Sequence, residues 1–315
     1  MVLLIIILFL IAFAFLLNAL YKRTNSFRNQ FVDVRKFAIK GGIGDNLEIV
    51  NLGSNHPKFG FDYSGIDVKG ENWAVGPQTL EYDFSILRIN VSHLAPGAVV
   101  VIPICLLKMF LYRQEGRAIH VKYYSCLPAK DIVGYSWLEK LNKYCLPLFF
   151  HPGALRSLIR DVKKDERLLL EENPLKTEEA LNKDADHWID IWNKEFNIQL
   201  PTPTLSQNNR NGIIQNVRIL GEMIEYCYSK GLKPVVTILP VTNYLRSRLT
   251  EEFVENHILG YIKDANKAGA PVLNYLSDER FTDSALYINS FFFNSKGRKA
   301  FTKQFVEDLK AQSIL

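Results

Sequence analysis

Cysteine is scarce in this sequence, and its spacing offers no metal site. Only 4 of the 315 residues are cysteines, which excludes a disulfide-rich scaffold. They show neither C-x-x-C spacing nor histidines at ligand spacing, so we expect neither a zinc centre nor another metal or cofactor. Cys126 and Cys145 could pair in an oxidising compartment, whereas Cys105 stands in an apolar run and is expected to be a small buried hydrophobic residue.

Strong charge of either sign is also absent. The formal net charge is +5, and the basic residues are spread along the chain rather than clustered. No aromatic-plus-basic motif of RNA-binding proteins occurs, so nucleic acid is not expected as a partner. With 18 glycines, 13 prolines and 48% hydrophobic residues, the sequence is neither collagen-like nor disordered. The composition predicts a globular body.

Charged residues are missing altogether from residues 2–20, which are apolar apart from Asn18. As a helix this run would be roughly 28 Å long, close to the hydrocarbon thickness of a bilayer. A cleavable signal peptide needs a basic start, a short apolar core and a small-x-small cleavage site, and none of these is present. We therefore expect residues 1–21 to be the transmembrane anchor of a single-pass membrane protein, with the bilayer as its partner, followed by a basic and then glycine-rich stalk at 22–46.

From residue 47 onward, short apolar runs alternate with amphipathic patterns. Four runs predict buried strands, at 47–52, 98–102, 234–239 and 272–275. Four segments have helical spacing, at 78–90, 213–230, 251–268 and 295–310. The alternation predicts an α/β fold over 47–315, with a doubly wound, mostly parallel sheet of the flavodoxin-like type. Residues 106–210 interrupt it, and we expect a mostly helical insertion there.

Ligands of open parallel sheets bind beyond the carboxyl ends of the strands, which directs attention to the turns that follow them. Ser54 comes directly after the first predicted strand and a glycine. It is placed either to act as a nucleophile or to cap the next helix. His56, two residues later, could contact a ligand, act as a base or pack in the interior. Three further turns are candidates for the same edge, at 76–78, 103–105 and 240–244.

Three segments resemble the opening of the SGNH (GDSL-like) hydrolase superfamily. They read N-L-G-S-N-H at 51–56, N-W-A-V-G-P-Q at 72–78 and G-A-V-V-V-I-P at 97–103. The likeness is greatest to the membrane-anchored branch found with bacterial cell-envelope polysaccharide genes. It implies that Ser54 is the nucleophile and that its own N–H, the N–H of Gly76 and the side chain of Asn243 bind an oxyanion. One such donor typically contributes roughly 3 to 4 kcal/mol to transition-state stabilisation.

The last block departs from this family. Residues 286–302 resemble the block in which Asp-x-x-His precedes Leu-Asn-x-x-Gly, but Asn289 stands where the acid belongs and Phe292 where the histidine belongs. Phenylalanine cannot accept a proton, and a serine hydroxyl without a base is a poor nucleophile. The resemblance therefore implies the fold more firmly than the chemistry.

Three functions remain open. The protein could be an acyl esterase or O-acyltransferase that modifies a cell-envelope polysaccharide through Ser54. It could be a catalytically inactive SGNH-like domain that binds glycan or a partner membrane acyltransferase. It could also be a tethered α/β domain unrelated to hydrolases. The resemblance implies a body outside the cytoplasm at the cell membrane, whereas the positive-inside rule favours the opposite orientation because basic residues follow the anchor, at Lys22, Arg23, Arg28, Arg35 and Lys36.

Overall fold

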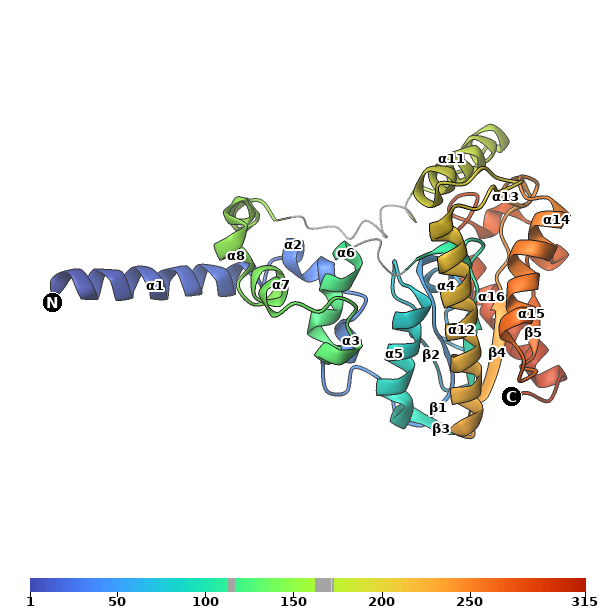
Figure 1. Cartoon of the computed structure of the whole chain (residues 1–315), viewed down its shortest axis with the longest axis horizontal. Helices are drawn as coiled ribbons and strands as arrows, with labels where there is room; N and C mark the ends of the chain where they lie inside the picture. Colours follow the sequence, from blue (N-terminus) through green and yellow to red (C-terminus); the bar gives the residue numbers. More distant parts are fainter. Residues whose placement is uncertain (113–116, 162–170, 172) are drawn as a thin grey trace. The chain divides into compact units, whose positions relative to one another are not determined.

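The computed structural model describes residues 1–112, 117–161, 171 and 173–315 (Figure 1). The chain divides into two units, which are treated separately below. Unit 1 comprises Met1–Ile43 and Gly116–Leu169, and unit 2 comprises Gly44–Glu115 and Leu170–Leu315. The segment expected as an insertion, 106–210, is therefore shared between the two units.

Unit 2 is an α/β fold built on a five-stranded parallel sheet. The strands are β1 (Leu47–Asn51), β2 (Gly70–Asn72), β3 (Leu94–Pro103), β4 (Lys233–Ile238) and β5 (Val272–Asn274). Their order is β2-β1-β3-β4-β5, and every neighbouring pair is parallel. This is the doubly wound order that the alternation of strands and helices predicted. The order reverses between β1 and β3, so their carboxyl ends form the topological switch point of the sheet.

Helices cover both faces of this sheet. The longer ones are α5 (Leu80–Asn90), α11 (Glu178–Phe196), α12 (Gln207–Ser229) and α16 (Ser295–Ala311). Short helical turns join them, at α4 (Asn55–Lys58), η2 (Val91–His93), η3 (Lys108–Phe110), α13 (Asn243–Arg246), η9 (Glu279–Phe281) and η10 (Ser284–Leu286). The helix expected at 251–268 consists of α14 (Glu251–Val254), the π-helical turn η8 (Glu255–Leu259) and α15 (Gly260–Ala265).

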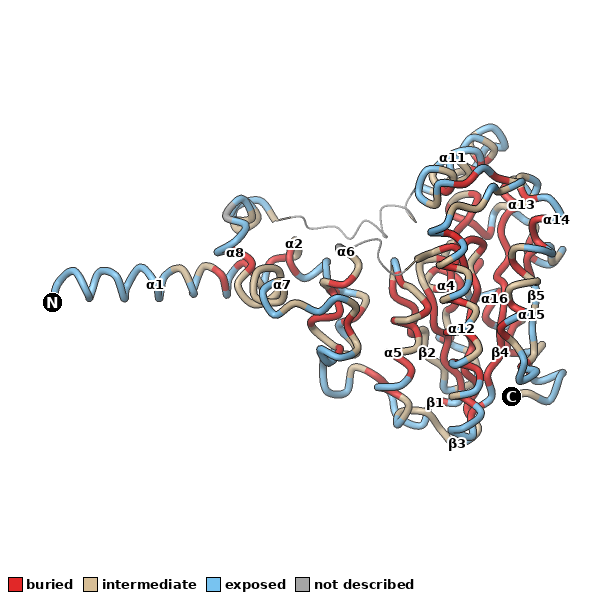
Figure 2. Tube along the Cα trace, viewed as in Figure 1, coloured by how far each residue is buried: buried red, intermediate tan, exposed pale blue. Residues whose placement is uncertain are grey.

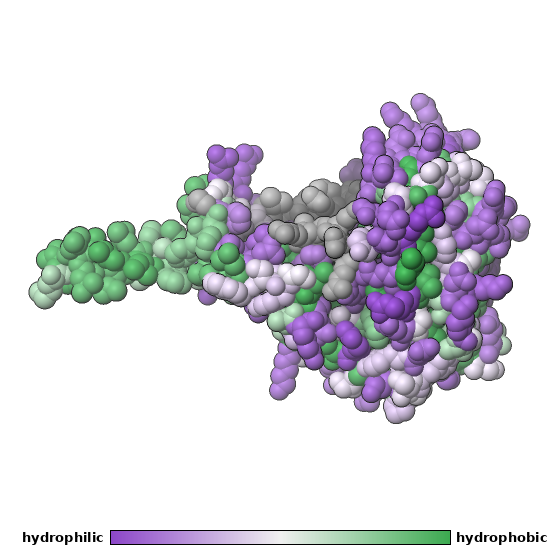
Figure 3. All heavy atoms as spheres, in the orientation of Figure 1, coloured by the Kyte–Doolittle hydropathy of each residue, from purple (hydrophilic) through white to green (hydrophobic). Residues whose placement is uncertain are grey.

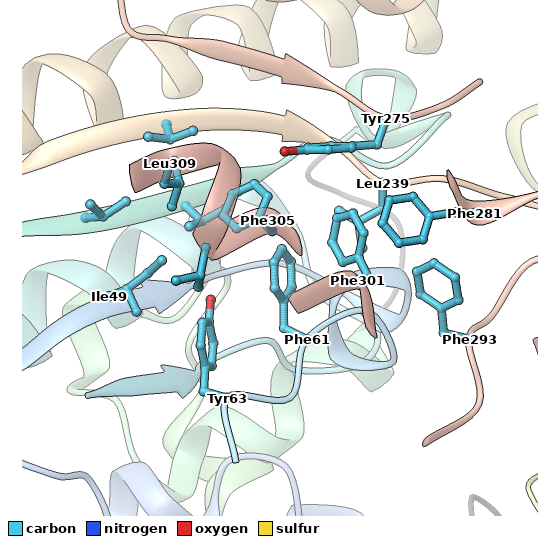
Figure 4. Packing of buried hydrophobic residues seen from close by; sticks show 14 of the residues in the cluster. Ile49, Phe61, Tyr63, Leu239, Tyr275, Phe281, Phe293, Phe301, Phe305 and Leu309 are labelled. Atoms are coloured by element: carbon cyan, nitrogen blue, oxygen red, sulfur yellow. The ribbon is translucent and has the colours of Figure 1, made fainter. Parts of the chain in front are cut away.

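The core of unit 2 lies between the sheet and α16. Val99 and Val101 of β3 alternate with Val100 along the strand, so they face α16, where Phe301 and Phe305 meet them. All five residues are completely buried. Figure 4 shows the rings of this cluster packed together with those of Phe61 and Tyr275. On the other face, α5 and α12 lie side by side (Figure 1), and α12 also contacts β4 and α15. A strand buried on both faces explains why residues 98–102 are apolar without alternation.

Unit 1 contains the apolar N-terminal helix and a group of short helices. Helix α1 (Val2–Tyr21) is long and apolar enough to cross a membrane, with a mean hydropathy of 3.1, and only 6% of its apolar window is buried. Figure 2 shows it exposed along most of its length. The short helices are α2 (Asn25–Arg28), η1 (Asn29–Phe31), α3 (Arg35–Ala38), α6 (Arg117–His120), η4 (Val121–Ser125), η5 (Ala129–Asp131), α7 (Trp137–Lys140), η6 (Leu141–Cys145), α8 (Pro147–Phe150), η7 (Pro152–Leu155) and α9 (Arg156–Ile159).

Most of the segment expected as a stalk is folded within unit 1. The hydroxyl of Thr24 caps α2 by accepting from the Phe27 N–H. The carboxylate of Asp161 accepts from the backbone N–H of Asn25 at 2.8 Å and of Ser26 at 3.0 Å. These hydrogen bonds join residues that precede 44–115 in the chain to a residue that follows it. All four cysteines are free thiols, so Cys126 and Cys145 are not paired.

Candidate functional site

The turns that follow β1, β2, β3 and β4 meet at the carboxyl edge of the sheet. The backbone N–H of Gln78 donates to Oγ of Ser54 over 3.0 Å. Nε2 of His56 lies 3.2 Å from the carbonyl oxygen of Pro240. The thiol of Cys105 lies close to the backbone of Ser54 and His56. These contacts gather all four turns at the switch point, where doubly wound folds bind their ligands.

Ser54 occupies a half-buried position between β1 and α4. It precedes the helix, but its side chain makes no capping hydrogen bond to it. Because its Oγ accepts from Gln78, the hydroxyl keeps its own hydrogen for donation. The turn before it requires glycine: Gly53 has φ of +121°, and a Cβ there would lie 2.3 Å from Cγ of Pro57. The sequence therefore places a serine hydroxyl, and not a helix cap, at the end of β1.

The two other oxyanion-hole candidates make different contacts. A Cβ at Gly76 would lie 1.7 Å from Oδ1 of Asn55, so the Asn55 amide packs directly on the backbone of Gly76. Asn243 is exposed in the first turn of α13. Its neighbour Thr242 makes the link to the last block instead, because the Thr242 hydroxyl donates to the carbonyl oxygen of Ser290 over 2.8 Å.

A buried ion pair joins the Ser54 turn to the end of β3. Nζ of Lys108 lies 2.8 Å from Oδ2 of Asp83 and 2.9 Å from the carbonyl oxygen of Gln78. The two charged side chains are only 3% and 1% exposed. Oδ1 of Asp83 accepts from the Gly53 N–H over 2.7 Å and also from the Gln78 side chain. Sequence reasoning missed this pair, although a single lysine inside the apolar run 104–111 was the available signal.

The thiol of Cys105 lies beside the Ser54 turn, close to the backbone of Ser54 and His56 and to the Lys108–Asp83 ion pair. Burial raises the pKa of the Cys105 thiol to about 11, and the ammonium of Lys108 opposes this rise only in part. At neutral pH the thiol therefore stays protonated, and it is neither an anion nor an activated nucleophile.

His56 is buried and neutral. Its ring packs against Phe291 at 4.4 Å between centroids, and it is 3% exposed. Burial lowers the pKa of His56 to about 3, and the bond to the Pro240 carbonyl opposes this shift only in part. That carbonyl can only accept, so Nε2 carries the proton and donates it. A base with so low a pKa takes up a proton weakly at neutral pH.

Aromatic rings surround Phe292, the position at which the sequence resemblance implies a histidine. The ring of Phe292 lies 5.1 Å from that of Phe59 and 5.5 Å from that of Trp188, and its side chain is 7% exposed. Asn289 has a structural role, because its Oδ1 accepts from the backbone N–H groups of Phe291 and Phe292. The side chains at these two positions therefore shape a turn and fill a core.

Helix α11, from the segment expected as an insertion, belongs to this edge. Asp184 accepts from the backbone N–H of Ser290 over 2.9 Å and from its hydroxyl. Trp188, four residues later and thus on the same face of the helix, packs on Phe291 and Phe292. Nothing in the sequence indicated these contacts, since they join residues about a hundred positions apart. Within the described residues, no group of three or more His, Cys, Asp or Glu side chains could hold a metal ion.

Comparisons with known proteins add little to this geometry. No protein-family model matches the chain, and no curated protein matches it. Among solved structures it is similar to the crystal structure of a candidate acylhydrolase from Bacteroides fragilis. That alignment covers 91% of this chain and 97% of the other at 13% sequence identity, with a TM-score of 0.36. A TM-score this low carries no conclusion about this chain, whose fold follows from its own sheet order.

Proposed function

We propose that this protein is a membrane-anchored SGNH-like domain that lacks hydrolase chemistry and acts by binding a cell-envelope polysaccharide. The observation that carries the proposal is Phe292. A serine hydrolase needs an imidazole that takes the proton of its nucleophile. Here the corresponding side chain is a phenyl ring packed against Phe59 and Trp188, and such a ring has no lone pair to offer.

Among the residues that the structure describes, none beside Ser54 replaces that base. His56 is the histidine of the Ser54 turn, but its pKa of about 3 and its bond to Pro240 make it a poor proton acceptor. The thiol of Cys105, whose pKa burial raises to about 11, stays protonated at neutral pH and accepts no proton from Ser54 either. The loss of the base supports a binding role over catalysis.

The membrane and polysaccharide parts of the proposal have different support. The exposure and hydropathy of α1 support an anchor, because an apolar helix of this length is unfavourable in water. The order of the sequence blocks supports a role in the cell envelope and a body outside the cytoplasm. A partner membrane acyltransferase is the other ligand that this resemblance implies.

One observation favours the alternative, an acyl esterase or O-acyltransferase acting through Ser54. Its hydroxyl is half-buried at the switch point and keeps a hydrogen to donate. A base brought by the substrate or by a partner protein would activate it. The experiment must therefore report directly on the reactivity of Ser54.

Labelling by a fluorophosphonate separates the two functions. We expect the full-length protein in detergent to gain no mass, and the Ser54→Ala variant to behave identically. Labelling of the natural protein that disappears in Ser54→Ala would establish an activated serine and refute the proposal. A second variant, Asn289→Asp with Phe292→His, restores the family dyad, and we expect it to label faster than the natural protein.

Binding of purified envelope polysaccharide to the natural protein, measured by calorimetry, tests the binding role.

A further inference from the structure

The C-terminal end of helix α1 is packed within unit 1, because a second segment of that unit lies along it. Asn18 is the polar interruption of the apolar run, and it is 5% exposed. Its Nδ2 donates to the carbonyl oxygen of Cys145 over 3.1 Å, and its Oδ1 accepts from the N–H of Leu148 over 3.2 Å. Helices α8 and α9 both contact α1, and Figure 1 shows α8 beside it.

This packing places aromatic side chains at a definite depth along α1. The rings of Phe15 and Phe149 lie 5.2 Å apart. Phe15 precedes Leu20, the last residue of the apolar run, by five residues, which is roughly 8 Å along a helix axis. Amphipathic segments that lie in a membrane interface bury their apolar side about 5 to 10 Å deep. If α1 spans a bilayer, Phe149 lies at that depth.

The apolar side chains around Phe149 face outward rather than into unit 1. Phe149 and Phe150 are 44% and 45% exposed, and Leu155 is 40% exposed. Ile159 is 92% exposed, more than any other isoleucine of the chain. Figure 3 shows that the apolar surface of α1 continues onto the part of unit 1 beside it. Exposed apolar side chains that continue the surface of a transmembrane helix indicate contact with lipid.

The charges of the same segment have one sign. Residues 146–160 contain Arg156 and Arg160 and no aspartate or glutamate. Arg156 and Arg160 are exposed, and they flank Leu155 and Ile159 in the chain. Cationic side chains next to exposed apolar ones are typical of segments that bind anionic lipid surfaces.

We propose that residues 146–160 form a second membrane contact, which lies in the headgroup region beside α1 and binds an anionic lipid surface. The inference rests on the membrane anchoring proposed above. Unit 1 then holds the membrane through two elements, a spanning helix and an interfacial segment. Asn18 joins them by satisfying two backbone groups at the bend before α8.

Photo-crosslinking from Ile159 tests this contact. Full-length protein carrying p-benzoylphenylalanine at Ile159 is placed in vesicles of phosphatidylcholine and phosphatidylglycerol, floated, irradiated and analysed by intact mass. The matched control carries the same group at Ile214, an isoleucine that is 69% exposed in unit 2. We expect at least tenfold more phospholipid adduct from position 159. Equal yields from the two positions in floated protein would overturn the inference and leave the anchor intact.

Failure of the anchor itself would look different. Protein that does not float with the vesicles would overturn the spanning helix and the interfacial contact together, whatever the reactivity of Ser54. The electrostatic part has its own variant, Arg156→Glu with Arg160→Glu. We expect it to lower the adduct yield severalfold when phosphatidylglycerol is present and to leave the yield unchanged in phosphatidylcholine alone. An unchanged yield in both vesicles would refute binding to anionic lipid.

Discussion

Asp83 and Lys108 form an ion pair beside the Ser54 turn, and both side chains are almost completely buried. We expect this pair to stabilise the turn. Removing one partner leaves an uncompensated charge in the interior, which typically destabilises a protein by about 3 to 5 kcal/mol. We expect Lys108→Met to lower the free energy of unfolding by that amount, measured by denaturant titration. The pair Arg218 and Glu222 is the control, since its side chains are 62% and 44% exposed.

For Arg218→Met we expect a loss below about 1 kcal/mol, as for other exposed pairs. Equal effects of the two substitutions would contradict the structural role given to Lys108. The comparison also checks whether Asp83 holds Gly53 and Gln78 in place. If it does, the backbone resonances of the Ser54 turn change in Lys108→Met and not in Arg218→Met.

His56 makes stability depend on pH in a predictable direction. Burial lowers its pKa from 6.5 to about 3, so the unfolded chain binds a proton at this residue between pH 6 and 4 and the folded chain does not. Its contribution to stability is therefore complete above pH 6.5 and decreases as the pH falls towards 3. The slope is at most about 1.4 kcal/mol per pH unit.

The variant His56→Phe keeps an aromatic ring against Phe291 and removes the titrating group. We expect its free energy of unfolding to vary less between pH 6 and 4 than that of the natural protein. Denaturant titrations at several pH values measure the difference. Parallel pH profiles for the two proteins would show that another group is responsible.

At the scale of elements, Asn18 links α1 to the bend between η6 and α8. Asn18→Leu removes two hydrogen bonds and leaves the Cys145 carbonyl and the Leu148 N–H without their partner. Each buried group left unsatisfied typically costs about 1 to 3 kcal/mol. In lipid nanodiscs we expect amide exchange at Leu148 to accelerate at least tenfold. Leu10→Ala, on an exposed part of α1, is the control that should leave this amide protected.

Elements with strong local signals were predictable from the sequence. The strand at 98–102 is apolar on both faces and bounded by Gly97 and Pro103, and it is the core of β3, the central strand. Helix α16 follows the predicted 295–310 closely, because Phe301, Phe305 and Leu309 recur at helical spacing. The helix at 78–90 begins two residues late, at Leu80, since Gln78 turns toward Gly53 and Asp83.

The candidate site was only partly predictable, for a physical reason. That the four turns meet follows from parallel strands, whose carboxyl ends share one edge. That His56 is neutral, or that the Cys105 thiol is protonated, depends on burial that tertiary packing sets. The contribution of Asp184 and Trp188 of α11 depends on contacts between distant parts of the chain, and no local pattern records them.

At the scale of the whole molecule, the chain folds into two units, and each unit is built from two segments that are separated in the sequence by a segment of the other unit. Unit 1 contains 1–43 and 116–169, so its two parts enclose the first part of unit 2 in the sequence. The anchor at 1–21, the stalk at 22–46 and the insertion at 106–210 are predictions from local patterns, which do not record which distant segments pack together. Long-range hydrogen bonds, such as those of Asn18 and Asp161, show which distant segments pack together in unit 1.

The two units each hold a thiol that can report on their unfolding. Burial raises the pKa of Cys126 in unit 1 and of Cys227 in unit 2 to about 12. Both thiols should therefore react slowly with a maleimide in the native protein and fast once their unit unfolds. Pulsed labelling across a denaturant series, with peptide mass analysis, gives one transition for each cysteine. We expect Lys108→Met to shift the Cys227 transition and Asn18→Leu to shift that of Cys126, because substitutions at distant sites act independently. Substitutions that shift both transitions equally would instead make the chain a single cooperative unit.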